Sequence, residues 1–190
     1  MGVNAAGQPP VRRKKKTAKK PIGKTLDGCN LRRHKLRKRT IRLGTLSVQG
    51  IRNKTGEIVK GLGKLKQDIT ILTETKKKGN GVEALGPYFR FYSGVPKEKR
   101  AKRGVSILVK MRYKRYITTW EAINENKIKL HMNIFGKKLR ILGIYAIRDD
   151  ENILRKEDFL GKLNEVIAEI GNSREILIAG DFNSRTGGKN

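Results

Sequence analysis

The sequence predicts an α/β fold built on a buried β-sheet, and three observations support this prediction. Four apolar runs, at residues 69–72, 105–109, 141–145 and 176–179, are nearly uninterrupted, as in strands that are covered on both faces. A helical stripe of apolar residues separates the last two runs. The length of 190 residues, 36% of them apolar, suits a single core of ordinary size, so we expect one domain.

The predicted elements begin at Ile41. The segment 41–48 (IRLGTLSV) has the apolar pattern of a strand. In the segment 53–67 (NKTGEIVKGLGKLKQ), Ile58, Leu62 and Leu65 are spaced like one face of a helix. The first buried run follows this helix.

The later elements include a strand with two different faces. In the segment 127–135 four apolar residues alternate with four polar ones, namely Ile128, Leu130, Met132 and Ile134 with Lys127, Lys129, His131 and Asn133. The alternation predicts one buried face and one solvated face. Residues 155–170 carry the helical stripe, which consists of Phe159, Leu163, Ile167 and Ile170, and Gly171 supplies a stop signal. We therefore expect a strand–helix–strand crossover onto the sheet.

Polar side chains follow several of the predicted strands. They are Glu74, Tyr145, Asp181 with Asn183 and, after the first strand, Ser47 with Gln49. Ligand sites in layered α/β folds lie beyond strand ends, so we expect these groups to meet on one rim. Two carboxylates with an amide and a phenol suit Mg²⁺, which would polarise a phosphoryl oxygen. The alternative is structural, because Asp and Asn often close a turn after a strand.

The net charge of +28 predicts a polyanionic partner, which is DNA, RNA or an anionic membrane surface. Residues 1–40 hold 14 Lys and Arg against one acid, and we interpret them as a disordered basic tail. Its two clusters, 12–20 and 31–39, indicate nuclear import or a tether to phosphate, although basic runs also occur without either role.

Basic residues in the body are candidates for contact with a nucleic-acid backbone. They are Lys76, Lys77 and Lys78, the segment 96–103 with Lys102 and Arg103, and the segment 110–115. The alternative is that these runs are solvated loops.

The single cysteine, Cys29, excludes an intramolecular disulfide and the paired cysteines of common metal sites, which fits a reducing compartment. No apolar stretch approaches the roughly 20 residues that a membrane helix needs. The basic N-terminus has no apolar segment behind it, so we expect no secretory signal and no membrane partner.

Five motifs occur in the order and spacing of the endonuclease/exonuclease/phosphatase (deoxyribonuclease I-like) superfamily: GTLSVQG, DITILTET, GVSILVK, LGIYA and ILIAGDFNSRTG. The chain most resembles the branch of LINE-type retrotransposon endonucleases and the craniofacial development protein 2-like proteins derived from them. The resemblance covers residues 41–190. It implies a four-layer α/β/β/α sandwich with Mg²⁺-dependent phosphodiester cleavage at one rim, and Mn²⁺ is the alternative ion.

The resemblance also implies a role for each rim residue. Glu74 falls on the family's metal-binding glutamate, and Tyr145 falls on its active-site tyrosine, which helps to orient the phosphate. Asp181 falls on the aspartate that acts on the attacking water, and Asn183 falls on the asparagine that contacts the phosphate. Ser47 falls on an asparagine that supports the metal. Because a hydroxyl is shorter and makes fewer hydrogen bonds than an amide, we expect weaker support there.

The family's final segment carries an Asp and His pair in an SDH motif, which residues 184–190 do not contain. The resemblance therefore implies a domain that is incomplete at its C-terminus, and neither His34 nor His131 is expected to substitute. Losing one well-placed electrostatic donor typically costs on the order of 100 to 1,000-fold in rate. We therefore expect impaired or absent turnover.

Three functions stay open at this point. The first is a nuclear, Mg²⁺-dependent endonuclease that acts on DNA in preference to RNA. The second is a catalytically dead remnant that binds nucleic acid through its basic surface. The third is a phosphatase of soluble phosphorylated substrates, against which the basic excess argues.

Overall fold

The computed structural model of the chain describes residues 40–169 and 175–183. The chain divides into two units, 1–39 and 40–190, and all described residues belong to the second. The predicted disordered tail, apart from Thr40, lies outside the described residues, as do 170–174 and 184–190.

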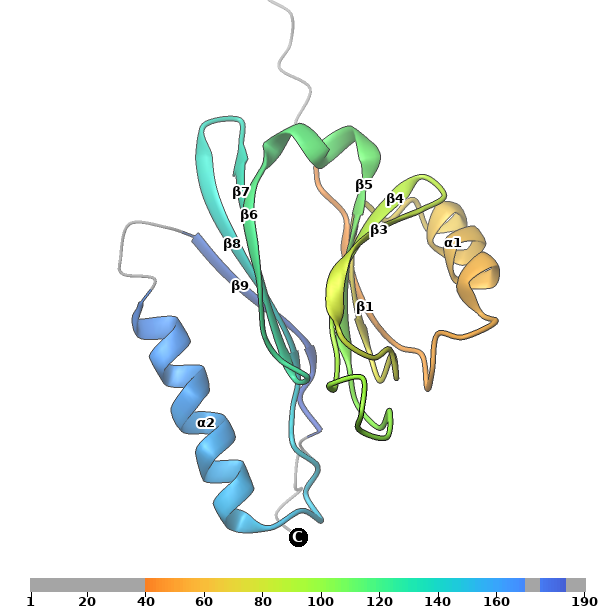
Figure 1. The fold of residues 1–190 in the computed structure, drawn as a ribbon. Coiled ribbons are helices and arrows are strands. Elements are labelled where there is room, and N and C mark those ends of the chain that lie inside the picture. The colour runs from red at the N-terminus through yellow and green to blue at the C-terminus, as the bar shows by residue number, and fades with distance from the viewer. Residues whose placement is uncertain (1–39, 170–174, 184–190) are drawn as a thin grey trace, which may run out of the picture. The chain divides into compact units, whose positions relative to one another are not determined.

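Two β-sheets lie face to face in the described unit (Figure 1). The first sheet has the strand order β1-β2-β5-β4-β3 and the second has the order β6-β7-β8-β9. The first is made of β1 (Leu43–Ser47), β2 (Ile69–Thr73), β3 (Asn80–Leu85), β4 (Tyr88–Ser93) and β5 (Val105–Lys110). The second is made of β6 (Ile117–Asn124), β7 (Lys127–Ile134), β8 (Lys137–Tyr145) and β9 (Glu175–Asp181). A 3₁₀ helix, η1 (Met111–Tyr116), connects the sheets.

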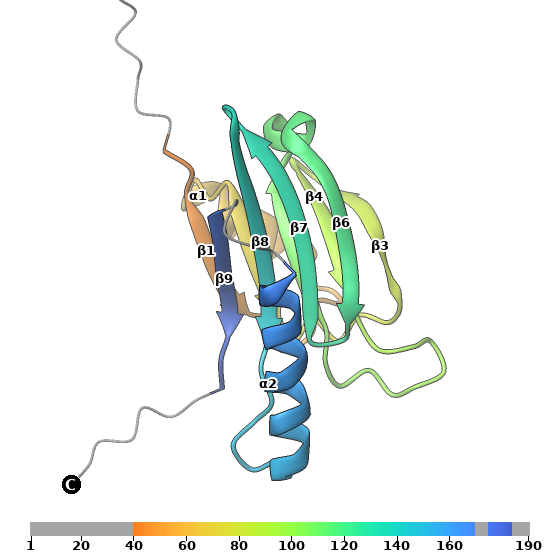
Figure 2. The ribbon, with the colours of Figure 1, turned by 90° about the vertical axis from the view of Figure 1, so that its left-hand side faces the viewer.

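One α-helix covers the outer face of each sheet (Figures 1 and 2). Helix α1 (Thr55–Lys64) packs Ile58 and Leu62 against Leu72 and Leu108 of the first sheet. Helix α2 (Ile153–Ala168) packs Val166 in one cluster with residues of the second sheet, namely Leu142, Ile144 and Ile178. The described layers are therefore helix, sheet, sheet and helix, which confirms the predicted α/β/β/α sandwich.

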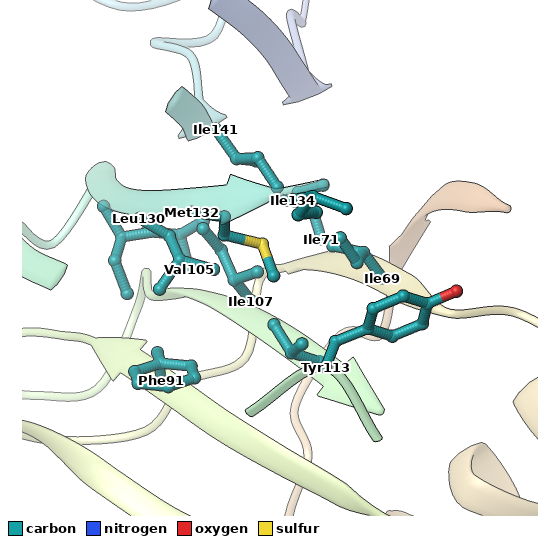
Figure 3. Packing of buried hydrophobic residues seen from close by; sticks show 12 residues of the cluster. Ile69, Ile71, Phe91, Val105, Ile107, Tyr113, Leu130, Met132, Ile134 and Ile141 are labelled. Atoms are coloured by element: carbon teal, nitrogen blue, oxygen red, sulfur yellow. The ribbon is translucent and has the colours of Figure 1, made fainter. Parts of the chain in front are cut away.

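The main core lies between the two sheets (Figure 3). The first sheet contributes Ile69 and Ile71 from β2 and three residues of β5, and the second contributes the apolar face of β7. Ile128 and Leu130 have no exposed surface, so the predicted buried face of this strand is confirmed. Burial of this much apolar area is the main force that holds the sheets together.

Three strands were not predicted, namely β3, β4 and β6. β3 and β6 are edge strands whose residues are mostly half-buried or exposed, so neither has a long apolar run. In β4 the buried Arg90 interrupts the aromatic residues. Such strands do not need the uninterrupted apolar runs on which the prediction rests. The run 176–179 has one but lies in the edge strand β9, whose residues are half-buried or exposed, so the expected cover on both faces is wrong there.

The prediction of a solvated face on β7 is wrong at Lys127 and Lys129. Lys127 has no exposed surface, because its Nζ donates to the Phe159 carbonyl of α2 at 2.8 Å and lies 3.9 Å from the centre of the Phe159 ring. Lys129 is buried as well and pairs with Glu121 at 2.7 Å. The alternation of apolar and polar residues shows only that the two faces of β7 differ. Here helix α2, rather than water, covers the polar face at Lys127. His131 is half-buried.

Lys127 makes the stability of the fold depend on pH. Burial, followed by repulsion from Lys162, lowers the pKa of Lys127 from 10.5 to about 8. Between pH 10.5 and about 8 the amine of Lys127 is therefore protonated in the unfolded chain and mostly neutral in the folded chain. The contribution of this group to folding stability is highest above pH 10.5, where the amine is neutral in both states, and it is lost as the pH falls through about 8.

We expect the stability of the wild type, relative to a Lys127→Met variant, to rise with pH across this window. The slope approaches about 1.4 kcal/mol per pH unit, because one pKa unit corresponds to that energy. Urea unfolding of both proteins from neutral to alkaline pH measures it, and subtracting the variant removes the titration of the other lysines. A difference that is independent of pH would contradict the assignment.

Candidate active site

Four of the predicted site residues lie together where three strands end. The Tyr145 hydroxyl, at the end of β8, donates to Glu74 Oε1 just beyond β2 at 2.8 Å. The parallel register of β8 and β9 pairs Tyr145 with Asp181. The backbone N–H of Asn183 donates to Asp181 Oδ1 at 3.0 Å. We call Glu74, Tyr145, Asp181 and Asn183 the rim cluster.

Gly180 allows β9 to bring Asp181 to this position. Its φ of 146° is a value that other residues rarely adopt, and a Cβ there would overlap the carbonyl group of Ile144 on β8. A glycine is therefore required immediately before the carboxylate.

Two residues of the rim cluster have left-handed backbone conformations. Glu74 has a φ of 52° and Asn183 has a φ of 47°. Such conformations are uncommon for residues with a side chain, and they occur preferentially at active sites and ligand-binding sites. Hydrogen bonds hold both segments: Glu74 O accepts from Gly50 N–H at 2.7 Å, and Asn183 Nδ2 donates to Ala146 O at 2.7 Å.

Asn126 fixes the main chain of Tyr145, and sequence analysis missed this residue. Its Nδ2 donates to the Tyr145 carbonyl at 2.6 Å, and its own carbonyl accepts from the Tyr145 N–H at 2.8 Å. The backbone N–H of Asn126 donates to Asn124 Oδ1, so it is not available to the Tyr145 carbonyl. The side-chain amide of Asn126 therefore takes the place of a main-chain donor at the end of the ladder between β7 and β8. An Asn in a hairpin turn carries no signal for this role, because turns commonly contain Asn.

The surroundings of Tyr145 keep its hydroxyl protonated. Burial, then the hydrogen bond to Glu74 and the charge of that carboxylate, raise the pKa of Tyr145 to about 12. At neutral pH the phenol is therefore a hydrogen-bond donor, and it cannot act as a base.

Titration of the phenol tests this geometry. A raised pKa contributes stability that is present below the ordinary value of about 10 and is lost as the pH rises towards the folded value. We therefore expect phenolate absorbance at about pH 11 to be almost the same for the wild type and a Tyr145→Phe variant, since Tyr145 is not yet ionised. If the phenolate absorbance of the two proteins at that pH differs by one whole tyrosine, while circular dichroism shows that both are folded, the contact with Glu74 is refuted.

The donor set of the rim cluster fits a hard divalent cation. The described residues include no group of three or more His, Cys, Asp and Glu side chains that could hold a metal. Mg²⁺ does not need such a group, because it binds through one or two carboxylates and keeps several waters. Glu74 and Asp181 each use one carboxylate oxygen in the hydrogen bonds above, so each has a second oxygen for other partners.

A basic cleft of about 830 Å³ adjoins the rim cluster. Glu74 and Tyr145 line it. Nine Lys and Arg residues also line it, against four acids: Lys76, Lys99, Arg100, Lys102, Arg103, Lys127, Arg148, Arg155 and Lys162, against Glu74, Glu125, Glu151 and Asp158. The formal charge of the lining is therefore +5, which favours a phosphate-containing ligand.

Three of the five predicted nucleic-acid contacts, Lys76, Lys102 and Arg103, line this cleft. Arg103 is also paired with Glu151, with 2.8 Å between Nη2 and Oε1. Lys77 and Lys78 are not part of the lining. Lys77 pairs with Glu83 at 3.1 Å, and Lys78 Nζ donates to the Lys97 carbonyl at 2.8 Å.

Ser47, the predicted weak metal support, lies elsewhere. Its exposed side chain lines a groove between β1 and α1 together with Leu46 and Lys54, and it is not part of the cleft lining. Gln49, two residues further on, has a φ of 48°, in the segment whose Gly50 N–H bonds to Glu74 O.

Comparisons with known proteins identify the fold. No protein-family model matches the sequence, and no curated protein matches it. The structure matches the solved 3′-5′ exonuclease NExo from Neisseria meningitidis at 20% identity, with a TM-score of 0.56 over 73% of this chain and 56% of that chain. A variant of the 3′ phosphatase NExo from Neisseria, bound to a product DNA hairpin, matches at 17% identity with a TM-score of 0.59, over 76% and 58%.

A third match extends the comparison to another kind of DNA enzyme. An AP endonuclease from Archaeoglobus fulgidus matches at 18% identity with a TM-score of 0.55, over 75% of this chain and 57% of that chain. The chain thus spans 56–58% of the length of these three proteins. The described unit shares the fold of these three solved structures, which is the layered fold that the motifs predicted.

Proposed function

We propose that the chain is a phosphodiesterase domain that hydrolyses DNA backbone bonds at the rim cluster with the help of Mg²⁺. One observation carries the proposal: two carboxylates, a protonated phenol and an amide converge beside a basic cleft of about 830 Å³. The solved structures of the same fold are named as a 3′-5′ exonuclease, a 3′ phosphatase bound to a product DNA hairpin and an AP endonuclease, which supports a nucleic-acid substrate.

Asp181 acts as the general base in this proposal. Its carboxylate accepts the N–H of Asn183, which fixes the orientation of the carboxylate relative to the end of β9. A fixed carboxylate beside a phosphate can accept a proton from the attacking water, and general-base catalysis of this kind contributes about 100- to 10,000-fold.

Tyr145 and Asn183 position the phosphate. Burial and the contact with Glu74 keep the phenol protonated, and its single O–H, which donates to Glu74 in the free protein, turns to a phosphate oxygen when the substrate binds. Asn183 donates one N–H to the Ala146 carbonyl and is hydrogen-bonded to the Tyr145 hydroxyl, so the amide and the phenol approach a phosphate oxygen together. The basic residues of the cleft attract the flanking backbone without reading its sequence.

Glu74 is the residue that would hold the divalent ion. When bound, the ion would polarise a phosphoryl oxygen and offset the negative charge that develops on it. Glu74 is suited to this because its carboxylate already lies at the cleft wall, with one oxygen held by Tyr145.

Plasmid nicking tests the proposal. The chain is incubated with supercoiled plasmid and Mg²⁺, beside a parallel reaction with EDTA. We expect nicked circles with Mg²⁺ and none with EDTA. Salt-sensitive plasmid binding without any nicking would overturn the enzymatic proposal and favour the second candidate.

The second candidate is a nucleic-acid-binding domain without turnover. The position of Ser47 favours it, because its exposed side chain faces the groove between β1 and α1 and gives the metal no support from β1. The charge of the cleft would still bind a phosphate backbone.

We also propose a nuclear location and an origin among retrotransposon endonucleases. The basic clusters at 12–20 and 31–39 support the first, and the five motifs support the second. Imaging of a tagged chain, with and without residues 1–40, tests the location.

A further inference from the structure

A polar groove lies on the outer face of the second sheet, away from the rim cluster. It has a volume of about 300 Å³ and is formed where β6, β7 and β8 lie side by side (Figure 2). We call it the outer groove, and its polar lining consists of Thr118, Thr119, His131, Asn133, Lys138 and Arg140. From Lys138, β8 runs on to Tyr145 in seven residue steps, which correspond to roughly 24 Å. A ligand at the rim cluster therefore does not account for these residues.

The outer groove continues the polar face of β7 beyond the first part that helix α2 covers. The helix packs over Lys127, and Glu169 at its C-terminal end approaches Lys129 at 3.5 Å. His131 and Asn133 are the next residues on this face, because successive side chains of a strand point to opposite faces. Both of them line the groove. The polar face of β7 thus passes from the helix into the groove.

The charge of the outer groove is positive. Lys138 and Arg140 line it, and among the described residues of its lining there is no Asp or Glu. The nearest carboxylate on β6 serves another lysine, since Glu121 pairs with Lys129 at 2.7 Å. Arg140 is only 6% exposed, so its charge belongs to the wall of the groove and is screened less by solvent than a surface charge. The groove therefore attracts an anion.

Hydrogen-bond donors surround this charge at the mouth of the outer groove. Thr119, Asn133 and Lys138 are exposed, and within the described part of the chain their side chains make no hydrogen bond or ion pair. A register shift between Ile117 and Thr119 marks a bulge in β6 beside the groove, and bulges re-aim side chains next to binding sites. A hydroxyl, an amide and an ammonium group beside a guanidinium are donors that suit the oxygens of a phosphate group.

We propose that the outer groove binds a phosphate group, which accepts hydrogen bonds from Lys138, Asn133 and Thr119. The charge of Arg140 in the groove wall strengthens this binding. Free phosphate and the phosphates of a nucleic-acid backbone share the required chemistry, and the experiment below distinguishes these two sources. The inference goes beyond the proposed phosphodiesterase, because the groove is separate from the cleft and binds its ligand whether or not the cleft is catalytic.

The imidazole of His131 gives a local readout, because this residue lines the outer groove. The chain has two histidines, His34 and His131, so in a His34→Gln background the single imidazole NMR signal belongs to His131. This full-length protein is titrated with inorganic phosphate at constant pH, with NaCl keeping the ionic strength constant. We expect a saturable shift of the His131 signal, from which the Kd for phosphate is obtained.

Two neighbouring lysines provide a matched pair of variants. Lys138→Gln removes the exposed charge of the groove, and Lys137→Gln removes an equal charge one residue away, where the lysine pairs with Glu175 at 3.2 Å outside the groove lining. Both lysines are exposed, so the melting temperatures should stay close to that of the parent protein. We expect Lys138→Gln to raise the Kd for phosphate at least about 10-fold, because a hydrogen bond to a charged group is lost, and Lys137→Gln to change it less than about twofold.

A second titration, with oligothymidine in EDTA, identifies the source of the phosphate. A shift that depends on Lys138 assigns the groove to a nucleic-acid backbone, whereas a shift with inorganic phosphate alone assigns it to free phosphate. Two results would overturn the inference: the absence of a saturable His131 shift with either probe, and equal weakening by Lys138→Gln and Lys137→Gln, which shows only general attraction to a basic protein. Because no cleavage is measured, a failure here is distinct from a failure of the proposed phosphodiesterase.

Discussion

Replacing Asp181 by asparagine is expected to lower the rate of Mg²⁺-dependent DNA cleavage by at least about 100-fold, the lower end of what a general base supplies. Asparagine has the shape of aspartate and keeps an oxygen that can accept the Asn183 N–H, now at 3.0 Å from Asp181 Oδ1. The fold and the end of β9 should therefore persist. What is lost is a negative oxygen that can take a proton from water.

Single-turnover cleavage of an end-labelled duplex measures this effect. Melting temperature and duplex affinity are recorded as controls, and both should stay close to the wild-type values because the cleft cations are untouched. Asn164→Asp, on the exposed surface of α2, is a control for handling and should cleave normally. A rate for Asp181→Asn within about threefold of the wild type would rule out the role of general base, because the smallest expected effect is about 100-fold.

Replacing Glu74 by glutamine is expected to lower cleavage at limiting Mg²⁺ by on the order of 100-fold, similar to the loss of a preorganised electrostatic group. Glutamine can still accept the Tyr145 hydroxyl, which lies 2.8 Å from Glu74 Oε1, so the contact across the sheets persists. The charge that attracts the cation is removed. Part of the activity should therefore return as the Mg²⁺ concentration is raised.

The Mg²⁺ titration distinguishes this residue from Asp181. For Glu74→Gln the apparent midpoint for Mg²⁺ should move to higher concentration, whereas for Asp181→Asn the maximal rate should remain low at every concentration. The phenol gives an independent readout. The carboxylate raises the pKa of Tyr145, so phenolate should form at lower pH in Glu74→Gln. An unchanged midpoint together with an unchanged phenol titration would remove Glu74 from the site.

The layered fold was predictable because its central strands are buried on both faces. Residues such as Ile69, Ile107 and Ile141 have no exposed surface, and strands of this kind have the continuous apolar runs from which the sheet was inferred. The edge strands β3 and β6 lack such runs, since one side of each strand has no neighbour and a polar residue there costs little. The burial of Lys127 was not predictable either. It depends on the position of α2 over the sheet, which local alternation does not report.

The rim cluster was predictable because each of its members lies at or just beyond the end of an apolar strand. Tyr145 and Asp181 end the parallel neighbours β8 and β9, and the face-to-face packing of the two sheets brings Glu74, just beyond β2, to them. The cleft was only partly predictable. Arg103 lies in a basic run, but Asn126 and Glu151 come from other loops and meet it only after the two sheets pack. Contacts between residues so far apart in the sequence cannot be inferred from a local pattern.

The central claim is that water activated at the rim cluster attacks a DNA phosphodiester. Cleavage in water enriched in heavy oxygen, followed by mass spectrometry of the new phosphate end, measures this most directly. We predict one heavy oxygen in the terminal phosphate of the wild-type product with Mg²⁺, and a labelled product at least about 100-fold slower to form with Asp181→Asn. Cleavage without label, or labelled product formed equally fast by Asp181→Asn, would contradict the claim.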